Sequence, residues 1–108
     1  MSAEIDNAMP ARKHVAPDDK IGLNLTADER DTILKDVRFL DDDYEQALCE
    51  TPISHAIEFT LGDWDYLGGE VYFEAQGADN PARRRRLNGV YARIEALLQS
   101  YCTHEEPN

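Results

Sequence analysis

The chain has 108 residues and carries 22 acidic side chains against 11 basic ones, a formal net charge of −11. This length allows one domain, and no stretch approaches the ~20 apolar residues that a membrane span requires. The acidic balance argues against general affinity for nucleic acid, because the chain as a whole repels phosphate.

The two cysteines, Cys49 and Cys102, are too few to form a disulfide framework and are expected to be reduced thiols. The N-terminus lacks the apolar core of a signal peptide. These features predict a cytoplasmic protein.

Both ends of the chain lack an apolar period. Residues 1–20 mix proline with charge and are expected to form a disordered tail, and residues 103–108 a second tail. Residues 21–102 then form a single small helical domain. A core built from roughly 80 residues has slim stability, which association with a second copy would improve.

A transition from strand to helix is predicted twice. Apolar residues alternate first at Ile21, Leu23 and Leu25, and again at Ile57, Phe59 and Leu61. Each run meets a threonine that is followed three positions later by an acidic residue: Thr26 with Glu29, and Thr60 with Asp63. Period-two alternation is typical of a half-buried strand, and Thr-x-x-Glu is the capping box that begins a helix. In the second copy Asp63 is a shorter substitute for glutamate, and Phe59 with Trp64 would form a hydrophobic staple. We expect the two strands to pair as an antiparallel ribbon.

Residues 27–50 contain no glycine or proline, and apolar residues recur there at spacings of three and four. The stripe consists of Ile33, Leu34, Val37, Leu40, Tyr44, Ala47 and Leu48. Thr51 precedes a proline and ends the helix. Phe39 lies ~140° from the stripe centre, so it is exposed, contacts a partner or marks a break. One long helix or two short ones are both compatible with this pattern.

Residues 61–76 predict the next helix, with Gly77 as its C-cap. Its core face consists of Leu61, Trp64, Leu67, Gly68, Val71 and Ala75. Gly68 and Gly69 each cost about 1 kcal/mol in a helix interior, which indicates close approach of another backbone, or a break that leaves residues 70–75 extended. We favour the helix.

The last helix is predicted from Asn80, an N-cap residue, and Pro81, which suits the first helical position. Its apolar stripe runs unbroken for four turns and consists of Leu87, Val90, Tyr91, Ile94, Leu97, Leu98 and Tyr101.

Four consecutive arginines, Arg83 to Arg86, lie in the first turns of this helix. Successive residues are ~100° apart, so Arg83 extends the apolar stripe, Arg84 and Arg86 flank it, and Arg85 points to the back. Helix N-termini favour anions, so the cluster requires a compensating anion. Acidic side chains of the same fold, a second protein surface, and phosphate or nucleic acid are the three alternatives.

Tyr66 and Phe73 lie opposite the core face of the helix over residues 61–76. Paired exposed aromatic residues are common in interfaces, but these two could instead pack within the molecule, under the N-terminal residues or against the first helix. The back of the last helix carries small residues that permit close packing: Gly89, Ala92 and Ala96.

No group of residues predicts catalysis. His14, His55 and His104 are scattered, and the spacings of zinc or di-iron ligands are missing. Glu70 and Glu74 share a helix face, an arrangement that is usually solvated. The sequence therefore predicts no catalytic, cofactor-binding or metal-binding residue and no small-molecule substrate.

Together the patterns predict an α+β fold that is mostly α, with three or four helices and a short two-stranded antiparallel ribbon in the order β-α(-α)-β-α-α. We expect a small, acidic, non-enzymatic interaction or regulatory protein that forms a homodimer or binds another protein. The expected contact surface is Tyr66, Phe73, Arg83, Arg84 and Arg86. The alternatives are a nucleic-acid-associated regulator that uses Arg83 to Arg86, and an acidic inhibitor that imitates nucleic acid.

Overall fold

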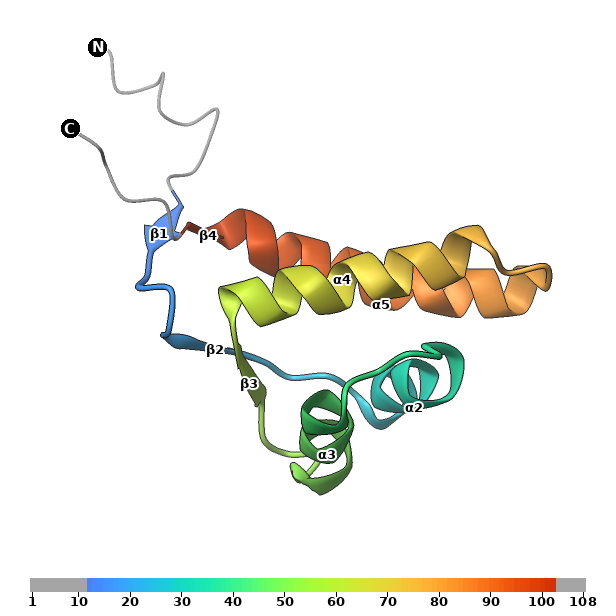
Figure 1. The fold of residues 1–108 in the computed structure, drawn as a ribbon, viewed down its shortest axis with the longest axis horizontal. Helices are drawn as coiled ribbons and strands as arrows, with labels where there is room; N and C mark the ends of the chain where they lie inside the picture. Colours follow the sequence, from blue (N-terminus) through green and yellow to red (C-terminus); the bar gives the residue numbers. More distant parts are fainter. Residues whose placement is uncertain (1–11, 103–108) are drawn as a thin grey trace, which may run out of the picture.

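The computed structural model describes residues 12–102. Two long helices, α4 (Leu61–Gln76) and α5 (Pro81–Ser100), form an antiparallel hairpin. The shorter helices α2 (Ala27–Asp36) and α3 (Asp42–Glu50) pack beside it together with the ribbon of β2 (Lys20–Leu23) and β3 (Ile57–Thr60), as Figure 1 shows. The predicted fold class and element order are confirmed.

The ribbon pairs antiparallel, as predicted, with Ile21 opposite Phe59 and Leu23 opposite Ile57. The alternation predicts the buried face correctly, because Ile21, Ile57 and Phe59 are all buried. Leu25 is also buried but lies beyond the end of β2.

A second pair of strands was not predicted. β1 (Lys13–His14) pairs in parallel with β4 (Tyr101–Cys102), which follows α5 directly. The amide of Val15 donates to the carbonyl of Cys102 at 3.0 Å and extends this pairing. Of the two predicted tails, residues 1–11 and 103–108 lie outside the described residues. The described part of the N-terminal tail contains β1.

The capping box at the start of α2 is complete. The amide of Glu29 donates to Oγ1 of Thr26 at 3.1 Å, and the amide of Thr26 donates to Oε1 of Glu29 at 2.9 Å. At the start of α4 only half of the box forms, because Thr60 accepts from the amide of Asp63 at 3.1 Å while the Asp63 side chain bonds elsewhere. The predicted staple is present as well, since the rings of Phe59 and Trp64 lie 5.0 Å apart.

The predicted stripe over residues 27–50 forms two helices, and the break is the linker 37–41. Phe39 lies in this linker with 76% of its surface exposed, so it both marks the break and faces outward. Thr51 ends α3 as expected.

Arg30 is 3% exposed and has no carboxylate partner among the described residues. Its guanidinium instead donates to four backbone carbonyls, those of Leu25, Thr51, Pro52 and His55. Since buried polar groups are costly unless they are hydrogen-bonded, these bonds keep the loop after α3 against the start of α2. No pattern in the sequence predicts this contact.

The close packing of α4 against α5 explains why one of the two interior positions of α4, Gly68, is a glycine. A Cβ on Gly68 would lie 3.0 Å from Cγ2 of Ile94, so the two helices approach closely there. The alternative of an extended segment over residues 70–75 is wrong, since α4 continues to Gln76 and Gly77 follows as its C-cap. Asn80 caps α5 by accepting from the amides of Ala82 and Arg83 at 2.8 and 3.2 Å.

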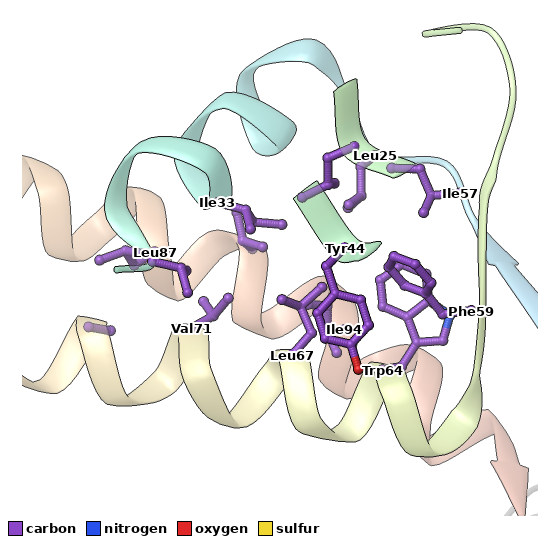
Figure 2. Packing of buried hydrophobic residues seen from close by; sticks show 14 of the residues in the cluster. Leu25, Ile33, Tyr44, Ile57, Phe59, Trp64, Leu67, Val71, Leu87 and Ile94 are labelled. Atoms are coloured by element: carbon purple, nitrogen blue, oxygen red, sulfur yellow. The ribbon is translucent and has the colours of Figure 1, made fainter. Parts of the chain in front are cut away.

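The core lies where α2, α3 and the ribbon meet the hairpin, and Figure 2 shows its packed side chains from close by. Trp64 is fully buried, and its indole nitrogen donates to the carbonyl of Ile21 at 2.8 Å. Tyr44 packs edge-on against Phe59 with ring centroids 5.0 Å apart. This arrangement leaves the outer surface of α4 free to carry the residues described next.

Candidate functional site

The exposed side of α4 is the surface that the sequence analysis singled out. Tyr66 is 44% exposed and Phe73 is 66% exposed. Seven residues separate them, which is about two helical turns, and Gly69 lies between them. We call this surface of α4 the aromatic face: Tyr66, Gly69 and Phe73. Phe39, in the neighbouring linker 37–41, is a further exposed aromatic residue.

Tyr66 also makes an internal contact. Its ring lies 5.8 Å from that of Tyr44 in α3, in a tilted arrangement. The contact with the first helical segment, one of the two predicted alternatives, is therefore present for Tyr66, although almost half of the side chain stays exposed.

Acidic side chains surround the Tyr66 end of the aromatic face. A hollow of about 500 Å³ between α3, β3 and the start of α4 is lined by four acids and one cation: Asp41, Asp43, Glu58, Asp63 and Lys20. The nearby charge of Glu70, followed by burial and the charge of Asp41, raises the pKa of Tyr66. This end of the surface is thus strongly negative.

Arginines gather at the opposite end of α4. Arg38 of the linker and Arg83 of α5 both approach Oε1 of Glu74 at 3.7 Å. Arg84 donates to the carbonyl of Ala78, in the turn that follows α4. Acidic side chains therefore gather at the N-terminal end of α4, and arginines gather at its C-terminal end, where Glu74 pairs with two of them.

Arg83 finds its anion within the fold. Its Nε lies 3.2 Å from Asp36 of α2, and Glu74, which is only 4% exposed, is its second partner. The expectation that Glu74 is solvated is wrong. Position 74 lies seven residues after Leu67 on the core side of α4, and this spacing is the signal that could have identified it.

Of the four arginines, only Arg83, which the angular spacing places on the apolar stripe, is partly withdrawn from solvent. Arg83 is half-buried and the other three are exposed. Arg86 lies 3.9 Å from Asp36, and Arg85 lines a groove of about 660 Å³ between α2 and α5. The groove has acids on its α2 wall and arginines on its α5 wall, and the pair of Arg93 with Glu29 at 3.0 Å spans it.

The structure thus brings Phe73 close to the arginine end and leaves Tyr66 at the acidic end. Arg38, which lies beside this surface, was not among the predicted contact residues. For Phe39, exposure and a partner contact were among the predicted alternatives, and it is exposed. The small residues Gly89, Ala92 and Ala96 lie together on the back of α5, along a shallow groove of about 400 Å³, away from the aromatic face.

Over positions 12–102, no three His, Cys, Asp or Glu side chains come together in a way that could hold a metal ion. No helix in this range is both long and apolar enough to cross a membrane. Cys49 and Cys102 are free thiols. Comparisons of the chain with protein-family models, curated proteins and solved structures gave no match.

Proposed function

We propose that this protein is a small acidic interaction protein, without enzymatic activity, that acts by binding protein through the aromatic face. The observation that carries the proposal is the exposure of Tyr66 and Phe73, which lie about two helical turns apart on one side of α4. Aromatic residues are enriched in the buried centres of interfaces, where charged residues are depleted. The polar rim of such an interface would come from the acids and arginines at the two ends of α4.

The internal pairing of the arginines favours this proposal over nucleic-acid binding. Arg83 is held by Asp36 and Glu74, and Arg86 is close to Asp36. Phosphate would have to compete with these carboxylates, whereas proteins that bind the backbone of nucleic acids use unpaired basic side chains, which neutralise phosphates and displace the counterions condensed on them.

A photo-crosslinking amino acid placed at position 73 tests the proposal in the native cells. We expect a discrete protein adduct, because Phe73 would be buried by the partner. The matched control carries the same amino acid at Lys35, an exposed residue of α2 whose side chain is 73% accessible, and should give no such adduct. Equal labelling from both positions, or no adduct from position 73, would reject the proposal.

A further inference from the structure

Gly69 occupies the centre of the aromatic face, and no contact with the described residues explains why this position is a glycine. A Cβ added there would meet no described atom within 4 Å, in contrast to Gly68, which Ile94 approaches. Glycine in a helix interior is less favourable than almost any other residue. A residue so small, midway between Tyr66 and Phe73, permits another helix to approach α4 closely.

The linker 37–41 adds charges of both signs beside this face. At Arg38 it contacts the C-terminal half of α4, where the Arg38 amide donates to Oε2 of Glu74 at 3.4 Å. At Asp41 it is near the N-terminal end of α4, where Asp41 and Asp63 line the same hollow. Arg38 and Asp41 therefore lie on the same side of α4, level with opposite ends of the face. The side chain of Arg38 is 70% exposed.

These positions satisfy a twofold symmetry. If a second α4 packs antiparallel against the first, an axis near Gly69 brings Tyr66 of each copy opposite Phe73 of the other. The same rotation keeps both linkers on one side of the interface, so that Arg38 of one copy faces Asp41 of the other. A parallel arrangement would place the linkers on opposite sides and would leave these charges unpaired.

We infer that the partner at the aromatic face is a second copy of this chain, in an isologous dimer with antiparallel α4 helices that meet at Gly69. This inference rests on the proposed function, since it uses the same face. A cationic segment from another protein would suit the acidic end but would meet the arginines at the other end. Only a partner with the reversed charge order complements both, and the rotated chain has that order.

Two electrostatic features keep the dimer weak. Glu70 follows Gly69 and would lie close to its own copy across the axis, and each chain carries a net charge of −11. Charges further apart than ~8 Å are screened at physiological ionic strength, so the net charge weakens the dimer without preventing it. The α4 helix is about 24 Å long at 1.5 Å per residue, so the contact is small for a stable dimer. We therefore expect a micromolar dissociation constant that decreases in the Glu70→Gln variant.

A glycine replacement separates association from folding. Gly69→Leu should raise the thermal unfolding midpoint of the monomer, because leucine favours the helix, and should weaken the dimer by about tenfold or more, because the added side chain overfills the contact. Gly89→Leu is the matched control. Gly89 is an exposed glycine of α5, and an added Cβ would meet no described atom within 4 Å. Its replacement should stabilise the helix without changing dimerisation measured by sedimentation equilibrium. Equal effects of the two substitutions on dimerisation would overturn the inference.

Charge reversal tests the antiparallel pairing itself. Arg38→Glu and Asp41→Arg should each weaken the homodimer, because each places like charges across the interface. An equimolar mixture should recover dimer, since both cross-interface pairs are then of opposite sign. A mixture that stays as dissociated as its components would contradict the antiparallel arrangement.

Arg38→Glu could impair folding, because its new carboxylate would lie near Glu74, so the test must not depend on this variant alone. Asp41→Arg alone must still weaken the dimer, whereas Asp31→Arg, the same reversal on the exposed surface of α2, must not.

The inference and the proposed function fail in different ways. A chain that sediments as a monomer up to roughly 1 mM overturns the dimer. In that case a crosslink from position 73 to a different protein would still support the proposed function. An adduct of twice the chain's mass that contains only this sequence supports both, and no adduct from position 73 rejects both.

Discussion

The hydroxyl of Tyr44 in α3 donates a hydrogen bond of 2.8 Å to Oδ1 of Asp63 in the first turn of α4. Asp63 therefore uses its carboxylate to connect two helices, while its backbone amide completes the cap at Thr60. Burial, followed by this hydrogen bond and the charge of Asp63, raises the pKa of the Tyr44 phenol well above its usual range.

This contact predicts a loss of stability at alkaline pH. The unfolded phenol has a pKa of about 10, and the folded-state pKa is higher, so the folded protein holds the proton more tightly. The stabilisation is complete below about pH 10 and is lost as the pH rises above that value. Urea denaturation at about pH 8 and about pH 11 should show a smaller decrease in the free energy of unfolding for Tyr44→Phe than for the wild type. Identical decreases would show that Tyr44 does not contribute to the alkaline transition.

The two threonine caps provide a second prediction. Thr26→Ala and Thr60→Ala should each lower the free energy of unfolding by about 1 kcal/mol, because an acceptor for a helix N-terminal amide is removed. Serine at the same positions retains the hydroxyl and serves as the control. Chemical denaturation measures the change, and an unchanged midpoint in both alanine variants would mean that the caps are not needed by the helices they begin.

The buried carboxylate of Glu74 provides a third prediction. Glu74→Gln should destabilise the fold by about 1–3 kcal/mol, because Arg83 and the amide of Arg38 lose a charged acceptor in a buried site. The loss stays in this range because Arg83 keeps Asp36 as a partner at 3.2 Å. Glu70→Gln, four residues earlier and only half-buried, should change the stability of the monomer by no more than about 0.5 kcal/mol. Thermal unfolding at a concentration too low for association compares the two variants. Equal losses of stability would show that Glu74 is not the buried acceptor for Arg83 and Arg38.

Nucleic-acid binding is the subject of the fourth prediction. A titration with mixed DNA and RNA should show little binding at physiological salt, since the chain is acidic and two of the four arginines have carboxylate partners. Fluorescence anisotropy at low and physiological salt measures this. Tight binding with a steep dependence on salt would favour the nucleic-acid alternative, because release of counterions from phosphate produces that dependence.

Local signals predicted the elements of this fold well. A threonine or asparagine cap together with a proline or an acidic residue specifies a helix start within a few positions, and the starts at Ala27, Leu61 and Pro81 were found in this way. The ribbon followed from period-two alternation alone. These features depend on neighbouring residues, so the sequence contains all that is needed to recognise them.

The features that escaped prediction depend on contacts between distant residues. Nothing in the local sequence distinguishes Arg30 from a surface arginine, and three of its four carbonyl partners belong to a loop more than twenty positions away. Glu74 differs from a solvated residue only through the arginines that the fold brings to it. For the candidate surface, Tyr66 and Phe73 could be placed on one side of a helix, but Arg38 and Asp41 could be added only once the linker was located.

The pairing of β1 with β4 has a consequence for the order of folding. Lys13 meets Tyr101, so this pairing closes a loop that contains nearly the whole domain, and only two residues on each strand repay the loss of chain entropy. The α4–α5 hairpin, in contrast, requires closure of one short turn. We therefore expect the hairpin to form early and the β1–β4 pair last, and amide hydrogens at this pair to exchange with solvent through local opening long before those of the helical core.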